Sequence, residues 1–317
     1  MNDKIIDFTI GADPEFACLN RKGGVVSAGD YVSEDDDVEF GADGNGITFE
    51  LRPGPSKDPL KIVNNIHDIF VRQTIDKPEF LKFKWVAGSW HSGYPMGGHV
   101  HFGLKASVVN FADAINHLDH YVGVVSLLLE IKSHGAKRRG DGYGGMGDMR
   151  VQPWGFEYRP MSSWLSSPYV AAAMLCLSKT VMYELLNNSK FEWHKFAVRD
   201  DFYKMNQERI LSKFPEIWND ITKMHLYQTY KPYIDLIYFL VKNRLTWIPA
   251  TGMKESWGVV NMQSCISNKI GLDVLWHRYN SDPVGFDVTI ERPTIERPAT
   301  PSRLNTATPI NNLLTTV

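Results

Sequence analysis

Residues 11–16 read Gly-Ala-Asp-Pro-Glu-Phe, which places two acids, Asp13 and Glu15, two positions apart in an apolar run. Three later segments repeat this arrangement of two ionisable side chains around one apolar residue. They are TFELRP with Glu50 and Arg52, GGHVHFG with His99 and His101, and GFEYRP with Glu157 and Arg159. Side chains two positions apart in a β-strand point to the same face. Each segment therefore predicts a strand with one apolar face and one ionisable face.

The remaining pattern predicts an α+β protein, because strand signals dominate the first half of the chain and helix signals the second. Alternating runs bounded by turn residues predict strands over residues 5–19, 47–52, 83–89, 99–104 and 155–159. Apolar residues at helical spacing predict a helix over residues 58–75, capped by Ser56, and another over 107–132. Further helices are predicted over residues 167–187, 200–214, 215–225, 230–243 and 267–279.

We expect one domain over residues 1–288, strand-rich over 1–165 and mainly helical over 166–288. The character of the sequence then changes, because residues 289–293 (TIERP) are repeated at once as residues 294–298. The stretch from there to residue 317 is rich in Thr, Pro and Asn. This composition predicts a flexible tail over residues 289–317.

Composition gives no reason to expect a nucleic acid or an anionic membrane as partner, because 34 basic residues nearly balance 36 acidic ones. The three cysteines, Cys18, Cys176 and Cys265, are far apart, which argues against a disulfide framework or a zinc-thiolate site. The first residues lack an apolar signal core, and no run reaches the roughly 18 apolar residues of a membrane span. These features predict a cytoplasmic protein.

Four carboxylates come close together if the four ionisable pairs share one sheet face, and such crowding raises their pKa values or recruits cations. With two imidazoles nearby and no thiolate, the ligand set is oxygen with some nitrogen, which suits Mg²⁺ or Mn²⁺ more than zinc. Arg52 and Arg159 can then hold anionic oxygens in bidentate fashion. The alternative is a face that merely meets solvent. Solvated faces usually carry Lys, Thr and Ser, however, and these eight positions carry none.

Taken in order, the four motifs resemble those of the phage-encoded type 2 amidoligases, carboxylate-amine ligases related to glutamate-cysteine ligase and glutamine synthetase. The resemblance covers about residues 5–170 by motif. It implies a curved antiparallel sheet of the glutamine-synthetase and glutamate-cysteine-ligase catalytic type, covered by helices. It also implies ATP and Mg²⁺, with Mn²⁺ possible, as cofactors.

Residue roles follow from the same resemblance. It implies that Arg159 contacts the transferring phosphate. His101 shares a face with His99 and is either a further metal ligand or a hydrogen-bonding partner of one. Asp13 stands where the glutamate-cysteine ligases have a longer Glu. The metal ligands implied are Asp13, Glu15, Glu50, His99 and Glu157.

Residues 137–145 (KRRGDGYGG) formally contain G-x-G-x-x-G, but a basic helix end precedes this loop and a strand is expected after it. That context excludes a Rossmann site, and the absence of Gly-Lys-Ser/Thr excludes a P-loop. A basic, glycine-rich loop can instead close over phosphates, using Gly144, Gly145 and Lys137, with Arg150 as an anchor. A solvated basic turn is the alternative for residues 137–139.

The predicted function is ATP-dependent ligation of a small-molecule or peptide carboxylate to an amine through an acyl phosphate, releasing ADP and phosphate. If the chain is phage-encoded, the compartment is the host cytoplasm. A metal-dependent hydrolase using the His and carboxylate cluster is one alternative. A non-catalytic phage structural protein that retains the fold is another. The identity of the acid and amine, the number of metal ions and the oligomeric state stay open.

Removing residues 294–317 is expected to leave the melting temperature and the catalytic rate nearly unchanged, because Pro-spaced polar repeats bury little surface. Thermal unfolding and turnover of the truncated chain measure this. A large loss of either would show that the tail packs on the domain or reaches the site.

Overall fold

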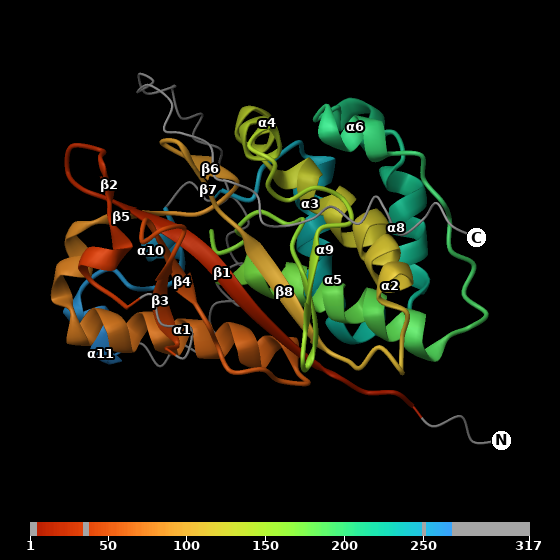
Figure 1. Ribbon diagram of the computed structural model, residues 1–317, viewed down its shortest axis with the longest axis horizontal. Coiled ribbons are helices and arrows are strands. Elements are labelled where there is room, and N and C mark those ends of the chain that lie inside the picture. Colours follow the sequence, from red (N-terminus) through yellow and green to blue (C-terminus); the bar gives the residue numbers. More distant parts are fainter. Residues whose placement is uncertain (1–4, 34–37, 249–251, 268–317) are drawn as a thin grey trace.

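The centre of the molecule is an antiparallel sheet with the strand order β3-β4-β1-β8-β10-β9, in which β2 and β5 also pair with β1 (Figure 1). The computed structural model describes residues 5–33, 38–248 and 252–267. The predicted α+β class is confirmed. The strands are β1 (Thr9–Leu19), β2 (Val25–Val26), β3 (Phe40–Asp43), β4 (Thr48–Leu51), β5 (Lys84–Val86), β8 (Gly98–Gly103), β9 (Met149–Gln152), β10 (Gly155–Tyr158), and the separate hairpin β6 (Trp90–His91) with β7 (Tyr94–Pro95).

Helices cover the apolar face of this sheet, and α1 and α5 run along it in Figure 1. Helix α9 packs on α5 and adds a further layer. The helices are α1 (Pro59–Asp76), α2 (Phe111–Leu118), α3 (Val124–Leu129), α4 (Lys132–Gly140), α5 (Pro168–Asn187), α6 (Arg199–Tyr203), α7 (Gln207–Leu211), α8 (Phe214–Lys223), α9 (Tyr227–Lys242), α10 (Met253–Ser256) and α11 (Met262–Ser267).

Aromatic packing joins the sheet to α1. Phe16 on β1 is buried and lies 5.4 Å from the ring of Phe49 on β4 and 5.5 Å from Phe70 on α1. Trp85 of β5 lies 5.4 Å away on the same side. Because Phe16 follows Glu15 directly, its burial turns the acid to the opposite face of the sheet. The aromatic core therefore fixes which face carries the ionisable side chains.

Helix α5 is the core helix of the molecule. The Ser167 hydroxyl caps it by accepting from the Val170 amide at 3.2 Å, and Pro168 occupies its first turn, as expected for a helix start. Within the described residues, it is the one helix whose length and apolar composition would suit a membrane span. The protein buries 83% of that stretch, which is typical of a core helix.

Several predicted bounds were wrong, because side-chain caps and local backbone conformation set the ends of elements. Helix α1 is capped by Asp58, whose carboxylate accepts from the Leu60 amide at 3.0 Å, and not by Ser56. The predicted helix over 107–132 begins at Phe111 behind the Asn110 cap, passes through a π-helical turn at Asp119–Gly123, and ends at Leu129.

The predicted helix over 200–214 is interrupted, because Met205 adopts a left-handed φ of 49° between α6 and α7. Strand β1 begins at Thr9, and the predicted strand over 83–89 shortens to β5. Strands β2, β3 and β9 and the β6–β7 hairpin were not predicted. Beyond Ser267, the predicted helix over 267–279 lies outside the described residues, as does the tail over 289–317. The domain boundary at residue 288 stays a prediction.

Replacing Phe16 by Ala is expected to destabilise the protein by about 3–5 kcal/mol, because the change leaves a cavity among buried rings. Urea unfolding measures the loss. Ile75→Ala, at a position that is 39% exposed, is the control and is expected to cost less than about 0.5 kcal/mol. Equal losses in the two variants would contradict the placement of Phe16 at the centre of the core.

Candidate active site on the polar face of the sheet

Strand register brings the four predicted pairs together on one face of the sheet. The strands involved are consecutive in the order β4-β1-β8-β10, so their polar residues form one continuous surface. The residues directly opposite one another are Glu15 and Glu50, Asp13 and His99, and His101 and Glu157. All six predicted metal ligands therefore lie on this face.

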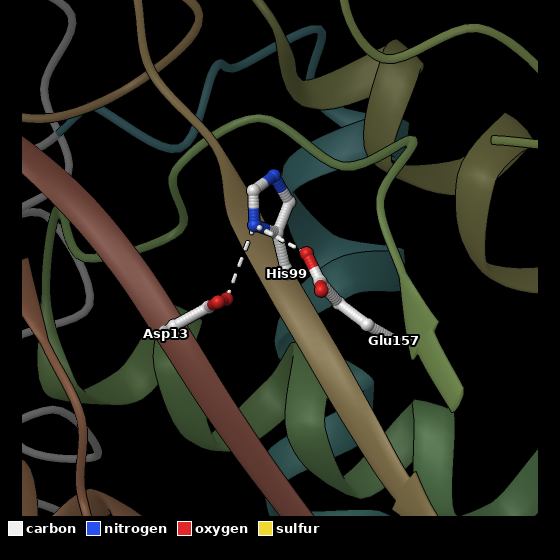
Figure 2. A group of neighbouring side chains, drawn as sticks. All are labelled: Asp13, His99 and Glu157. Atoms are coloured by element: carbon white, nitrogen blue, oxygen red, sulfur yellow. Dashed lines mark ion pairs between the residues drawn. The ribbon is translucent and has the colours of Figure 1, made fainter. Parts of the chain in front are cut away.

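Asp13, His99 and Glu157 form the first cluster, which we call the histidine group (Figure 2). The Nδ1 atom of His99 lies 3.1 Å from Oδ1 of Asp13 and 3.2 Å from Oε1 of Glu157. His101 approaches the other Asp13 oxygen, Oδ2, with its Nε2 atom at 3.2 Å. His99 and Glu157 are buried, and the side chain of Asp13 is 16% exposed. One aspartate therefore lies between two imidazoles.

Glu15, Asp43 and Glu50 form the second cluster, which we call the carboxylate group. One potential ligand atom from each of the three lies within 4.8 Å of the others. Glu15 and Glu50 are buried, whereas Asp43 is exposed at the end of β3. The backbone amide of Gly97 donates to Oε2 of Glu15 at 3.1 Å and fixes that side chain.

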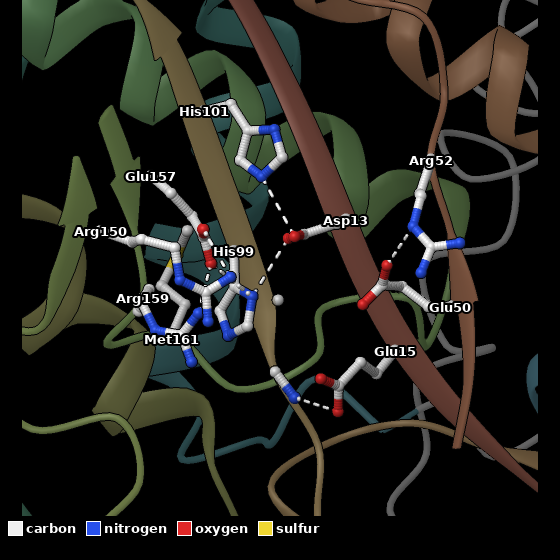
Figure 3. Close-up of polar contacts among 12 residues, drawn as sticks. Asp13, Glu15, Glu50, Arg52, His99, His101, Arg150, Glu157, Arg159 and Met161 are labelled. Carbon is white, nitrogen blue, oxygen red and sulfur yellow. Dashed lines mark hydrogen bonds and ion pairs between the residues drawn. The ribbon is translucent and has the colours of Figure 1, made fainter. Parts of the chain in front are cut away.

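Arginines border both groups, as Figure 3 shows. Arg52 lies beside the carboxylate group, with its Nε atom 2.5 Å from Oε1 of Glu50. Arg159 donates from Nη1 to Oε1 of Glu157 at 2.6 Å, and Arg150 approaches Oε2 of the same carboxylate at 3.4 Å. The Arg150 side chain is 59% exposed, so its guanidinium is accessible to a ligand. The three arginines predicted to bind anionic or phosphate oxygens during catalysis thus all contact acids of the face.

The two groups differ in electrostatic balance. Although burial opposes ionisation, the imidazoles of His99 and His101 hold the pKa of Asp13 well below its usual range. Burial, followed by repulsion from a neighbouring carboxylate, raises the pKa of Glu15 well above its ordinary value. Burial and the surrounding acids also raise the pKa of Glu50 to about 10. The carboxylate group, if fully ionised, would therefore carry more negative charge than its surroundings balance.

Two of the three basic residues before the glycine-rich loop are buried structural groups. Arg138 donates to the carbonyl oxygens of Pro160 and Met161 at 2.7 and 2.8 Å. Arg139 forms a buried ion pair with Glu130, at 2.7 Å between Nη1 and Oε2. Neither residue fits the alternative of a solvated basic turn, because a helix, α4, carries both into the protein.

The other residues predicted to bind phosphate in this region lie around the same loop. Lys137 is exposed on α4. Gly144 adopts a left-handed φ of 70°, and a Cβ atom there would meet the Arg138 guanidinium at 1.8 Å. A Cβ atom on Gly145 would lie 2.7 Å from the Tyr203 hydroxyl. The glycines thus let the loop pack closely on α4 and α6.

Sequence reasoning did not assign two residues that the structure places in the site. Asp43 lies on the approach to the Glu50 strand, where the resemblance to related ligases implies another acidic ligand, but it was assigned no role. Residues 44–46 (Gly-Asn-Gly) are a hairpin-turn signal that would have placed Asp43 on the same face. Tyr143 was not singled out, although it is the one aromatic residue in a glycine-rich loop. Its hydroxyl lies 2.7 Å from Nε2 of His99 and 3.3 Å from Oε1 of Glu15.

The chemistry of both groups fits a divalent cation such as Mg²⁺ or Mn²⁺. Oδ1 of Asp13, Nδ1 of His99 and Nε2 of His101 are buried and make no hydrogen bond. Nδ1 of His99 nevertheless lies 3.1 Å from Oδ1 of Asp13, and Nε2 of His101 lies 3.2 Å from Oδ2 of the same carboxylate. Carboxylate oxygens with a minority of imidazole nitrogens are ligands typical of these ions. A cation in the carboxylate group would also counteract the burial and the carboxylate repulsion that together raise the pKa of Glu15.

The fold resembles that of a solved ligase. The complex between the prokaryotic ubiquitin-like protein Pup and its ligase PafA aligns with a TM-score of 0.54 at 10% identity, covering 88% of this chain and 72% of that one. GmaS without ligand aligns with a TM-score of 0.43 at 11% identity, covering 76% of this chain and 71% of GmaS. A bifunctional glutathione synthetase from Pasteurella multocida aligns with a TM-score of 0.41 at 13% identity, covering 88% of this chain and 52% of the synthetase. No curated protein matches the sequence significantly. The PafA alignment shows a shared fold, that of a ligase.

A family comparison identifies the group to which the sequence belongs. The model described as phage phiEco32-like COOH.NH2 ligase-type 2 matches residues 10–259, which include every strand of the central sheet except the first residue of β1. The chain belongs to this family and is an amide-bond-forming ligase. The resemblance seen in the four sequence motifs is thereby confirmed.

Replacing Glu15 by Gln is expected to flatten the pH dependence of stability in the metal-free protein. The pKa of Glu15 in the folded protein lies well above its ordinary value of 4.5, so the folded state binds a proton that the unfolded state has released. Stability contributed by this proton is lost as pH rises above 4.5, at up to about 1.4 kcal/mol per pH unit.

Urea unfolding in EDTA at pH 6, 7 and 8 measures the slope in both proteins. Glu39→Gln is the matched control, because Glu39 is an exposed glutamate that pairs with Arg72 outside the site. A Glu15→Gln variant with the wild-type slope would show that Glu15 is already ionised in the folded protein.

Proposed function

We propose that this ligase uses ATP to activate a carboxylic acid as an acyl phosphate and then joins the acid to an amine, with Mg²⁺, or Mn²⁺ in its place, as the metal. The observation that carries this proposal is the histidine group and the carboxylate group side by side on one sheet face, each with ligand atoms close enough to hold a cation and each bordered by arginine. Triphosphate chemistry needs dense positive charge around phosphoryl oxygens, and two cation groups with flanking guanidinium groups can supply it.

Each part of the face has a proposed role. The histidine group, with His101, and the carboxylate group would hold the cations, which neutralise phosphate charge when bound. Arg159 and Arg150 would contact the transferring phosphoryl group, and Arg52 an anionic oxygen beside the carboxylate group. The backbone of Gly144 and Gly145, with Lys137, is the proposed further contact to the nucleotide.

The chemistry proceeds in two steps. A carboxylate oxygen of the acid forms a bond to the γ-phosphorus of ATP while the bond to the ADP oxygen breaks. The amine nitrogen then bonds to the acyl carbon, phosphate leaves with the electrons of the C–O bond, and the amine loses a proton. Residues of the face contribute by binding and orienting the anionic groups, because positioning and charge dominate phosphoryl transfer.

The substrate classes proposed are a small-molecule or peptide carboxylate and an amine. The fold relative PafA is described as the ligase of Pup, itself a protein, so a polypeptide substrate is compatible with this fold. We propose the cytoplasm as compartment, that of the host if the chain is phage-encoded, and neither nucleic acid nor membrane as partner. Family membership does not favour the hydrolase or the purely structural alternative.

A panel of acids, led by glutamate and glutamate-containing peptides, is expected to include one that gives a hydroxamate with Mg-ATP and hydroxylamine. Hydroxylamine replaces the unknown amine because it is a small, strong nucleophile. The hydroxamate is expected to form in step with ADP and phosphate, because cleavage occurs at the γ-phosphorus. Coupled assays of hydroxamate and of ADP measure both products.

Glu157→Gln and His99→Ala are expected to abolish this turnover while the protein stays folded, with Glu39→Gln as an active surface control. Retained activity in both site variants would remove these strands from the site. Hydroxamate formed with AMP would indicate adenylate chemistry. Cleavage of esters or phosphoesters without ATP would support the hydrolase.

A further inference from the structure

The glycine-rich loop delivers one large side chain, Tyr143, onto the polar face. Gly142 and Gly144 on either side of it adopt left-handed φ values of 78° and 70°. Behind the ring, the Arg138 guanidinium lies 4.6 Å from the ring centroid and is itself held by the carbonyls of residues 160 and 161. The position of the phenol is therefore set by buried, hydrogen-bonded structure.

The Tyr143 hydroxyl lies between the histidine group and the carboxylate group. It is 2.7 Å from Nε2 of His99, in the first, and 3.3 Å from Oε1 of Glu15, in the second. Gly97 leaves room for this contact, because a Cβ atom there would come within 2.4 Å of Nε2 of His99 and 2.7 Å of the hydroxyl. The contact between Tyr143 and His99 therefore requires a glycine at position 97.

The two ring nitrogens of His99 serve different partners. Nδ1 faces Asp13 and Glu157 at 3.1 and 3.2 Å, whereas Nε2 faces Tyr143. A cation ligated through Nδ1 leaves the ring proton on Nε2. That N–H then donates to the phenol oxygen, and the phenol O–H donates to Oε1 of Glu15. The hydrogen bonds run in one direction, from a ligand in one group to a ligand in the other.

We propose that Tyr143 is a positioning residue that holds His99 in the tautomer that binds a cation through Nδ1 and ties it to Glu15, so that the two cation groups are assembled together. This inference rests on the proposed function for its metal, but it concerns metal binding and not the reaction. Outer partners of metal ligands typically contribute a factor of about 10–100 in metal affinity.

Tyr143→Phe tests the proposal by removing the hydroxyl and keeping the ring. The matched control is Tyr121→Phe, since Tyr121 is also buried and its hydroxyl donates to the carboxylate of Asp220 at 2.7 Å, away from the site. Urea unfolding in EDTA reports the structural cost of each change. Mn²⁺ binding is measured without nucleotide, by calorimetry and by the electron paramagnetic resonance signal of free Mn²⁺. Its affinity shows whether the hydroxyl positions His99 for the cation.

We expect wild type and Tyr121→Phe to bind two Mn²⁺ ions with similar affinities, and Tyr143→Phe to bind at least one of them about 10-fold or more weakly. Wild-type Mn²⁺ affinities in a folded Tyr143→Phe variant would overturn the proposal. So would a wild-type protein that binds no Mn²⁺ at millimolar concentration. If Tyr143→Phe does not fold, Gly97→Ala provides the test. The added methyl group forces the Tyr143 hydroxyl and the His99 ring apart while the hydroxyl is still present, so this variant is also expected to bind Mn²⁺ more weakly. Unchanged Mn²⁺ affinity in Gly97→Ala would overturn the proposal.

The proposed function can fail separately. If wild type binds two Mn²⁺ ions, Tyr143→Phe loses affinity and no acid in the panel yields ADP, the inference about Tyr143 stands while the ligase chemistry proposed above falls. If ADP and hydroxamate form but Tyr143→Phe binds Mn²⁺ as wild type does, the ligase chemistry stands and the inference about Tyr143 falls.

Discussion

The crowding of carboxylates on one sheet face is the constraint on which the rest of the structure depends. Glu15 and Glu50 sit directly opposite each other on neighbouring strands, and Asp13 lies on the same strand as Glu15. Ladder hydrogen bonds prevent the strands from moving apart, so the acids cannot relieve their repulsion by shifting. A slip of one residue would turn these acids into the aromatic core and Phe16 onto the polar face. The apolar core therefore enforces an arrangement that the carboxylates alone would oppose.

Buried arginines stabilise the frame around that face. Arg138 supplies donors to the backbone that follows β10, and Arg139 pairs with Glu130 just before α4. Removing one partner of such a buried pair would leave an uncompensated buried charge. The stability lost in this way is far larger than the stability that an exposed ion pair contributes. The loop after α4 is consequently a fixed wall of the site, which suits a residue such as Tyr143 that must meet its partners at hydrogen-bonding distance.

The alternation of ionisable and apolar residues along single strands predicted the part of the site that those strands form. Two ionisable residues around one apolar residue specify a strand face without knowledge of the partner strand, and this placed all the predicted metal ligands correctly on one surface. The position of Asp43 in the site depends on a turn that brings the chain back beside the Glu50 strand. The position of Tyr143 depends on the path of a loop packed against an arginine. Strand periodicity therefore carried no information about either residue. Arg138 and Arg139 show the converse, because a basic run beside glycines is typical of phosphate binding and here serves packing.

Family membership and the arrangement of the two histidines both weigh against the hydrolytic alternative. A hydrolytic zinc site would bring several imidazoles to one ion. Within the described residues, the histidine group contains the single imidazole of His99, with His101 approaching its Asp13, and the carboxylate group contains none. His99 faces Asp13 and Glu157 through Nδ1, while His101 reaches the opposite oxygen of Asp13 and packs 5.0 Å from the Trp154 ring. The H-x-H strand thus adds nitrogen ligands or partners at the edge of an oxygen-rich surface. Such a surface favours hard cations over zinc, and hard cations are what the proposed activation of a carboxylate by ATP would require.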